Sequence, residues 1–502
     1  MAIKTFQINS ILGGQSAAYK AYGDGQFLTS LGIDPERQLN SAILRSSSMI
    51  VPTRYEKFSG ATMDSAPYWI LTSPKSTTIY IYAQNGDIFS YTSALASETL
   101  VGTVTGGNGS GAAYYNNYHY FAADDNVARY GPLDGSPSLT QDVWTGATLG
   151  SQPALDTTVD HPMHFHEDTL YFGDYVNGYG VINAITTTKV SAEGDTNNGS
   201  NDAVLNLPFG FKVVDIESFG TDLAILAYQG SASVTRGNAA LFLWDTNSTS
   251  WYRRVNLPYD NATALINRNG SLILFGTTGV TLQISEYVGG YGVNHIASLL
   301  DLTSPQPGAI DINGNRIAWL SRTTYPTTAV GVFTLGYENP RLPGYAINCI
   351  GRATVSGSTP SGHSLKFLRA NEYVGQPIVG WSDSDGNEGL DKRSSTATFN
   401  SVFRSQVFPV GQRFTIKRVR IPMGVVVDTN MSVTPKIYVD NEVSNVTLTE
   451  INSTKYPGSA RLVDDFTPVH GHNNFFLELN FAGSALLPID LPITITVETQ
   501  ND

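Results

Sequence analysis

The pattern of apolar and polar positions along the chain repeats one kind of β-hairpin. Its clearest copy follows the turn Asn269-Gly270, whose residues tolerate positive φ, and begins with the apolar run Leu272–Phe275. The letters GTTG come next and are typical of a turn, and from Val280 to Ile284 apolar and polar residues then alternate. A continuous apolar run followed by an alternating one predicts one strand buried on both faces and one buried on a single face.

Similar apolar strands recur at steps of roughly 40 to 53 residues, in or near the range of propeller blade repeats. They begin near Ile79, His119, Leu170, Leu223, Leu272, Ile317 and Leu365. A single four-stranded blade cannot bury both of its faces, whereas blades stacked around an axis can. We therefore predict an all-β chain with a β-propeller over residues 61–392, in which seven blades are favoured and six are the alternative. Leu274, Tyr171, Ile225 and Trp319 are expected to be buried.

The two ends of the chain have a different character. Residues 1–60 predict an N-terminal arm with one short helix that begins near Asp34-Pro35. Such an arm can bind its own domain or a neighbouring copy, and we expect it to bind other subunits. Its candidate anchors are Phe6, Ile8, Ile11 and Leu12. Within residues 393–502, segments such as Phe475–Phe481 and Leu491–Val497 alternate apolar and polar positions, which predicts an antiparallel β-sandwich. Its expected core includes Ile493, Ile495, Leu477 and Leu479.

Composition and charge reduce the number of function classes that fit the chain. The net charge is -13 and only 15% of residues are charged, which argues against wrapping nucleic acid. The densest basic patch, Lys417-Arg418 with Arg420, is interpreted as a solvated strand face. Cys349 is the only cysteine, which rules out an intrachain disulfide and fits assembly in a reducing cytosol. We expect no signal peptide and no membrane-spanning segment.

One histidine cluster is the strongest candidate for chemistry. On a strand, His164 and His166 of DHPMHFHED share a face, and Asp160 or Glu167 could complete a metal site with them. His161 has the opposite parity, so a polar blade edge is the alternative that we favour. His470 and His472 form a weaker pair.

The stretch from Asp383 to Gly389 resembles a calcium loop because its oxygen ligands alternate. Glu388 stands where an EF-hand requires glycine, and no helices are expected beside it, so a hairpin or linker turn is favoured. The aromatic loops around Tyr179 and Tyr291, each with a glycine on both sides, could stack on a sugar, but turn formation explains them.

No nucleophile elbow, zinc-protease motif, phosphate loop or dinucleotide motif occurs in the chain. The 43 acidic residues allow many pairs, so no particular glycosidase pair can be chosen. We therefore assign no catalytic, cofactor-binding or metal residue and expect a protein that is not an enzyme.

Several stretches resemble tail proteins of bacteriophages, although together they cover under a fifth of the chain. LILFGTTGVTLQISEYVGG resembles the strand–turn–strand segment of the propeller tail hub proteins of short-tailed phages, also called packaged-DNA stabilisation proteins. SAILRSSSMIVPTRYEKFSG, from Ser41 to Gly60, is similar to the segment before their first blade. QVFPVGQRFTIKRVRIPMG and SVTPKIYVDN resemble sandwich strands at the ends of phage tail and spike-associated proteins.

The resemblance implies a structural protein of the virion tail, assembled in the host cytoplasm as a ring of identical copies. Its partners would be other tail or head-to-tail connector proteins and tail fibres, and genomic DNA would pass without sequence-specific binding. The C-terminal domain is larger than those hubs need, so hub, nozzle, adaptor and fibre-bearing tip all stay open. The alternative function is a propeller that binds a receptor or glycan, including a glycan-degrading tail spike.

Overall fold

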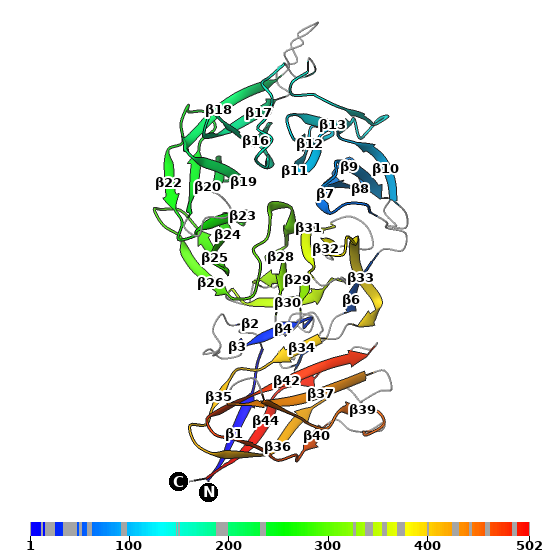
Figure 1. The fold of residues 1–502 in the computed structure, drawn as a ribbon, viewed down its shortest axis with the longest axis vertical. Coiled ribbons are helices and arrows are strands. Elements are labelled where there is room, and N and C mark those ends of the chain that lie inside the picture. The colour runs from blue at the N-terminus through cyan, green and yellow to red at the C-terminus, as the bar shows by residue number, and fades with distance from the viewer. Residues whose placement is uncertain are drawn as a thin grey trace.

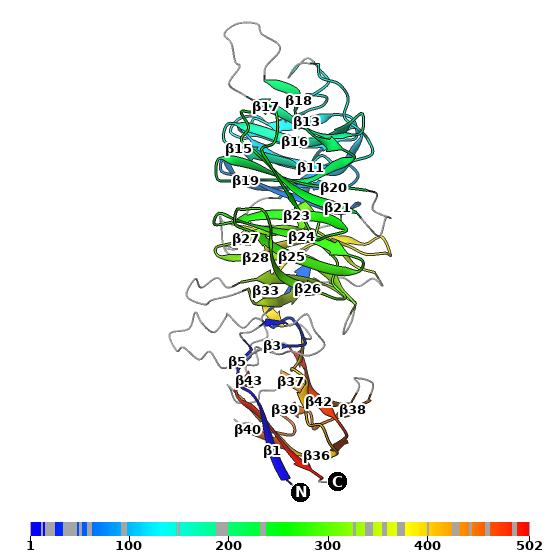
Figure 2. The ribbon, with the colours of Figure 1, turned by 90° about the vertical axis from the view of Figure 1, so that its left-hand side faces the viewer.

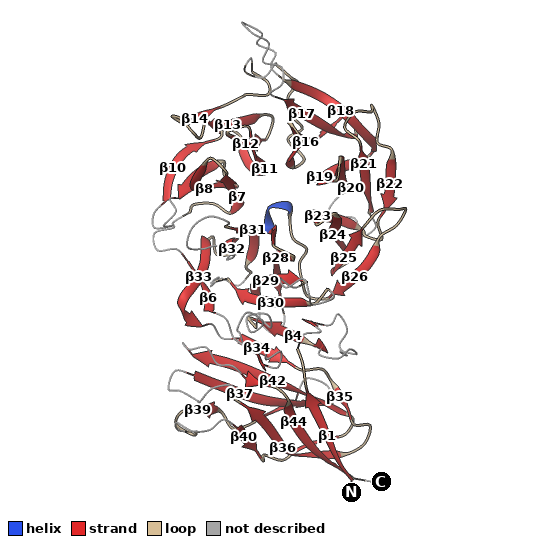
Figure 3. Ribbon diagram, turned by 180° about the vertical axis from the view of Figure 1, so that it is seen from behind, coloured by secondary structure: helices blue, strands red, loops and turns tan. Residues whose placement is uncertain are grey.

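The chain folds almost entirely into β-strands. The computed structural model describes residues 2–11, 14–15, 26–33, 48–49, 53–57, 63–91, 98–146, 148, 151–186, 199–230, 237–324, 328–336, 345–353, 359–368, 377–398, 401–423, 431–440, 444–456, 462–483 and 489–500. Apart from strands, these residues form one 3-10 helix, η1 (Pro307–Ala309), and the predicted all-β class is confirmed (Figure 3). The short helix predicted near Asp34 lies outside the described residues.

Seven four-stranded antiparallel sheets stand in a ring around a common centre, which makes the larger part of the chain a β-propeller (Figure 1). They are called blades one to seven here, in chain order. Blades one to three are β7 (Pro67–Ser73), β8 (Ser76–Ala83), β9 (Asp87–Tyr91) and β10 (Glu98–Thr103); β11 (Gly107–Tyr115), β12 (Tyr118–Ala123), β13 (Val127–Gly131) and β14 (Ser138–Thr140); and β15 (Met163–His166), β16 (Thr169–Val176), β17 (Tyr179–Thr186) and β18 (Ser200–Phe209). Blades four and five are β19 (Phe211–Phe219), β20 (Asp222–Gln229), β21 (Asn238–Trp244) and β22 (Arg253–Asn256); and β23 (Asn261–Arg268), β24 (Ser271–Thr278), β25 (Thr281–Tyr287) and β26 (Asn294–Leu299). Blades six and seven are β27 (Ile310–Asn313), β28 (Arg316–Thr323), β29 (Ala329–Leu335) and β30 (Ile347–Arg352); and β31 (Ser361–Phe367), β32 (Pro377–Ser382), β33 (Glu388–Thr398) and β6 (Thr53–Lys57).

The second strand of each blade is buried on both faces because a neighbouring blade covers each side. Leu274, Ile225 and Trp319 are fully buried and Tyr171 is 7% exposed, as predicted. Blades four and five share one apolar core, and blades five and six share the next. Stacking therefore removes from water the apolar surface that a lone sheet would expose.

The hairpin of β24 and β25 differs from its prediction at the turn. β24 continues to Thr278, so the turn lies at Gly279-Val280, and the Val280 side chain is 85% exposed. Gly276 stays inside the strand and serves a different purpose. A Cβ atom at Gly276 would lie 2.5 Å from the Asn261 carbonyl oxygen and from the Tyr259 ring, so the missing side chain permits close packing.

An N-terminal strand closes the ring. β6 pairs with β33 as the outer strand of blade seven, while the other three strands of this blade come from residues 361–398. Tyr55 on β6 is fully buried, and a Cβ atom at Gly351 would lie 2.2 Å from its ring. Both segments must therefore be present before the last blade is complete.

A polar contact between inner segments bridges each seam between neighbouring blades. In two of these contacts a carboxylate on an inner strand accepts a backbone N–H of the next blade: Asp215 from Leu265 at 2.8 Å and Asp311 from Phe367 at 2.7 Å. The remaining five join Trp69 to Gly109, His161 to Ser110, His166 to Ser218, Thr263 to Ser304 and Ser364 to Pro67. Because these bonds are buried or partly buried, they fix the register between blades as well as holding them together.

Two sheets form the smaller domain and pack over a shared core (Figure 2). The first contains β1 (Ala2–Ile8), β44 (Ile493–Thr499), β36 (Phe414–Pro422), β40 (Leu462–Asp465) and β41 (Val469–Gly471). The second contains β38 (Ser444–Thr447), β37 (Met431–Val439), β42 (Asn474–Gly483), β34 (Ser401–Arg404), β4 (Thr29–Leu31), β35 (Phe408–Pro409) and β39 (Ile451–Asn452). The four predicted core residues Ile493, Ile495, Leu477 and Leu479 are all fully buried, as predicted.

The N-terminal segment binds its own chain, which is one of the two possibilities for the predicted arm. β1 pairs with β44 over seven residues, and Phe6, Ile8 and Ile11 pack in or against the core of the smaller domain. These side chains are therefore used within the chain and are not available to anchor it on another subunit, which corrects the expectation for this segment. Leu12 lies outside the described residues.

Further along, this segment joins the two parts of the molecule. β4 pairs with β34 of the smaller domain, while the N–H groups of Gly32 and Ile33 donate to the carbonyl of Cys349 on β30 at 2.9 and 3.2 Å. The Cys349 thiol is buried, and burial raises its pKa to about 11. The segment also contains the short strands β2 (Gly14–Gln15), β3 (Gln26–Phe27) and β5 (Ser48–Met49). β2 pairs with β3, and β5 pairs with β43 (Ile489–Asp490) near the C-terminus.

Candidate functional site

The centre of the propeller holds a cavity of about 480 Å³ at the end where the inner strands begin. Blades one to five and the segment around η1 contribute to its wall, so only the closed ring creates it. The residues that define its chemistry are Tyr68, Trp69, Asn108, Ser110, Thr158, Asp160, Lys212, Tyr228, Asn261, Thr263 and Gln306. The volume is in the range of pockets that bind small molecules, which run from roughly 300 to 1,000 Å³.

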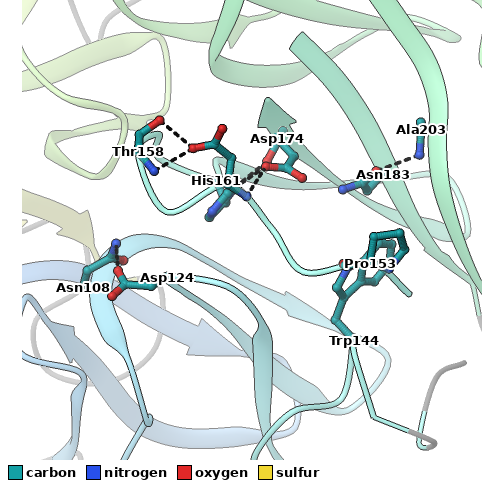
Figure 4. Close-up of polar contacts among 11 residues, drawn as sticks. Asn108, Asp124, Trp144, Pro153, Thr158, His161, Asp174, Asn183 and Ala203 are labelled. Carbon is teal, nitrogen blue, oxygen red and sulfur yellow. Dashed lines mark hydrogen bonds and ion pairs between the residues drawn. The ribbon is translucent and has the colours of Figure 1, made fainter. Parts of the chain in front are cut away.

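The loop before β15 carries Asp160, which is one of the residues that line this cavity. Figure 4 shows Thr158 and His161 of the same loop. The Asp156 carboxylate accepts hydrogen bonds from the backbone and hydroxyl of Thr158, at 2.8 and 2.5 Å. The backbone N–H of Asp156 donates to Asp174 at 3.0 Å. His161 is fully buried; its Nδ1 lies 3.0 Å from the Gly173 carbonyl oxygen and 3.6 Å from Asp174. These contacts on both sides of Asp160 fix its backbone.

Asp160 lines the cavity and is exposed to solvent. It forms no hydrogen bond or ion pair with any residue that the structure describes. Burial raises its pKa, and the nearby His161 partly opposes that rise. Burial also raises the pKa of Tyr68 and of Tyr228, and the Asp160 charge adds to both shifts. The two phenols therefore lie within the electrostatic range of this carboxylate.

Lys212, Asn108 and Gln306 of the lining each contact other residues, whereas the Oδ1 atom of Asn261 has no hydrogen-bond partner among the described residues. The Lys212 ammonium lies 5.0 Å from the centre of the Tyr175 ring. Asn108 donates to Asp124 at 2.6 Å, as Figure 4 shows, and accepts from the Ser110 N–H. Gln306 donates to the His363 carbonyl oxygen at 2.8 Å. Asp160 is the single carboxylate in the lining, whereas glycoside hydrolysis needs two.

The three histidines of the candidate metal cluster do not converge on one point. His164 and His166 share a face, as predicted, and both contact the Ser218 hydroxyl at 2.9 Å across the seam to blade four. His164 also lies 3.3 Å from Glu217. His161 is held on the other side by Asp174, and the described residues contain no group of three or more metal-binding side chains. The alternative, a polar blade edge, describes His164 and His166 correctly.

The calcium-like loop is the hairpin turn between β32 and β33, which confirms that interpretation. Its own backbone occupies the Asp383 carboxylate, because the N–H groups of Asp385 and Asn387 donate to it at 2.9 and 3.0 Å. In the smaller domain, His470 lies 2.9 Å from the Thr415 hydroxyl, and the His472 backbone N–H donates to Asp440.

The remaining sequence candidates lie on the surface. Tyr179 packs edge-on against Phe209, and Tyr291 is 88% exposed. The basic strand face is partly neutralised within its own sheet: Lys417 pairs with Glu498, and Arg418 and Arg420 both pair with Asp464. None of these residues lines the central cavity.

The cavity itself was not predicted. Asp160 was singled out only as a possible metal ligand, and Tyr68 and Tyr228 lie on different blades, 160 residues apart. One usable signal is that Tyr68 and Trp69 begin the first strand of a blade, where inner strands of a ring come together. The sequence does not indicate which of the many loop residues would face the axis.

Comparison with known proteins gives the fold class and little more. No family model matches the chain, and no curated protein matches it. Among solved structures, it is similar to the WD40 repeats of RRP9 at 11% identity and a TM-score of 0.44, over 68% of this chain and 99% of that one. It is also similar to the β-propeller domain of Cps50 (Swd1) from Myceliophteria thermophila, at 7% identity and a TM-score of 0.44, over 68% and 100% of the two chains.

A third similar structure is the WD40 domain of Pan2 from Neurospora crassa, at 9% identity and a TM-score of 0.40, over 69% of this chain and 97% of that one. Likeness at this level concerns the fold alone. Among the residues described, none lies in a helix with the length and apolar character needed to cross a bilayer.

Proposed function

We propose that this chain is a structural component of a phage tail that assembles with copies of itself in a ring and contacts other tail proteins. The observation that carries the proposal is the position of the segment that resembles the region before the first blade of tail hub proteins. Its described part includes β6, the strand that closes the ring, with Tyr55 buried at the last seam. The other resembling segment forms β24 and β25 of blade five.

The architecture favours a mechanical role. Pairing of β6 with β33 and of β1 with β44 joins parts of the chain that are more than 300 residues apart. Separating either pair requires strand hydrogen bonds to break together, and such long-range connections resist local opening. A virion tail needs subunits of this kind because they must keep their shape under load.

An exposed group of aromatic residues offers a surface for protein contacts. The Arg253 aromatic patch consists of Tyr252, Arg253, Val288 and Tyr291 on blades four and five. The Arg253 guanidinium lies 5.8 Å from the Tyr252 ring and 5.3 Å from the Tyr291 ring, and donates to the Gly290 carbonyl oxygen at 3.2 Å. Tyrosine and arginine are enriched where binding energy concentrates in interfaces, and this arginine is already held in place.

Electron micrographs of the purified full-length chain and of one variant test the proposal. We expect closed rings of the unaltered chain, and we expect Tyr291→Ala to reduce them. Val280→Ala is the matched control, because Val280 is also exposed but lies in the turn at the opposite end of the same blade. Single two-lobed particles that bind a host glycan would overturn the proposal in favour of the alternative function.

A further inference from the structure

The central cavity contains an unpaired negative charge beside aromatic side chains. Asp160 has no hydrogen-bond or ion-pair partner among the described residues, and Tyr68, Trp69 and Tyr228 line the same cavity. Asp160 is exposed to solvent in the cavity, so a ligand can reach its carboxylate directly, and a cation placed beside it gains a favourable charge interaction.

The protein does not supply that counter-ion from the lining. The ammonium of Lys212, the lining's one lysine, lies against the Tyr175 ring, and no ion pair joins it to Asp160 among the described residues. His161 follows Asp160 in sequence but contacts Gly173 and Asp174 instead. The carboxylate therefore remains available to a ligand that enters from solvent.

We propose that this cavity binds an organic cation, a primary ammonium or a guanidinium group, which pairs with Asp160 and packs against the aromatic lining. Aromatic faces attract cations, and a carboxylate accepts charge-assisted hydrogen bonds from either group. A neutral sugar would leave the carboxylate without a counter-charge. The cation has two possible sources, a free small amine and a lysine or arginine side chain of a partner protein.

Calorimetric titration of the full-length chain at low salt tests the inference. Nα-acetylarginine methyl ester is the cationic probe, and Nα-acetylcitrulline methyl ester, whose α-amino group is likewise blocked, is its neutral counterpart of similar shape. We expect saturable binding of the arginine ester, no measurable binding of the citrulline ester, and at least a tenfold loss of affinity in Asp160→Asn. Asp125→Asn is the matched control, because Asp125 is an exposed carboxylate in the hairpin turn between β12 and β13 and does not line the cavity. It should bind as the unaltered chain does.

A peptide with one central arginine, blocked at both ends, separates the two sources. Tighter binding of the peptide than of the ester indicates a side chain of a partner protein, and binding of the ester alone indicates a free small molecule. Equal binding of the arginine and citrulline esters, or binding that survives Asp160→Asn, would overturn the inference. So would binding of N-acetylglucosamine that is unaffected by the variant. The two tests use different variants, Asp160→Asn and Tyr291→Ala, and different measurements, so this inference and the proposed function can fail separately.

Discussion

His119 on β12 is fully buried, and neither of its ring nitrogens has a hydrogen-bond partner among the described residues. The rings of Tyr80 and Tyr114 lie 4.8 and 5.6 Å from it. Burial lowers its pKa from 6.5 to about 3, since the charged imidazolium would lose its hydration. The unfolded chain therefore binds a proton that the folded chain rejects between these two pKa values. The contribution of His119 to the free energy of unfolding is therefore fully present above pH 6.5 and decreases as the pH drops through this window.

We predict that His119→Phe makes the propeller less sensitive to acid. At pH 5, proton uptake by His119 in the unfolded chain lowers the free energy of unfolding by about 2 kcal/mol relative to pH 8. His119→Phe has no imidazole at this position and so does not lose this stability at acid pH. Denaturant unfolding at both pH values measures the difference. His363, whose pKa burial lowers to about 4, will leave part of the acid sensitivity in place. His472→Asn, a change at an exposed position, is the control; equal acid sensitivity of the native chain and His119→Phe would contradict the prediction.

A second prediction at the residue scale concerns the core of the smaller domain. Ile495 is fully buried, whereas its neighbour Thr496 on β44 faces the other side of the sheet and is half-buried. Ile495→Asp should lower the free energy of unfolding by several kcal/mol, on the order of the cost of burying an unpaired charge. Thr496→Asp should have a much smaller effect. Similar losses in the two variants would show that the faces of β44 are assigned wrongly.

At the scale of elements, β1 belongs to the smaller domain. Phe6 packs against Phe408 and Phe475 at ring distances of 5.4 and 5.3 Å, while Ile3 on the opposite face is 76% exposed. We predict that Phe6→Ala lowers the unfolding free energy by roughly 2 to 3 kcal/mol, somewhat less than for a fully buried phenylalanine. Ile3→Ala should change it by less than about 0.5 kcal/mol. Chemical denaturation measures both, and equal values would mean that β1 is not docked in solution.

The elements show which parts of the fold were predictable. Buried strands such as Leu272–Phe275 were found because their continuous apolar run reflects cover on both faces. The GTTG turn was misplaced because a glycine needed for close packing at Gly276 has the same letter as a turn glycine. The pairing of β1 with β44 was missed because nothing local distinguishes a strand that pairs across nearly the whole chain from an arm that binds a partner.

At the scale of the whole molecule, the site could not be predicted from the sequence because its residues come together only when the propeller ring closes. The cavity wall combines residues from the loop before β15, from η1 and from the first strands of several blades, and their side chains meet only when the ring is closed. Tyr68 and Asp160 have no shared motif, so their meeting follows from the ring geometry alone. The histidine cluster had a motif-like spacing, yet the ring directs His164 and His166 to Ser218 and His161 to Asp174.

The two ends of the chain lie together at the far end of the smaller domain (Figure 2). Both are paired within the chain, with β1 as an edge strand of its sheet, and the Arg253 aromatic patch is the candidate surface for assembly. A ring of copies requires a head-to-tail contact between two different surfaces of the subunit, with a rotation that closes.

The mass of the purified full-length chain in solution tests this account most directly. One copy has a mass of 54.2 kDa. The account predicts a single assembled species whose mass is a whole multiple of this value and does not drift upward with concentration, as expected for a closed ring. A mass of 54.2 kDa at every concentration up to tens of micromolar, an order typical of stable assemblies, would contradict it.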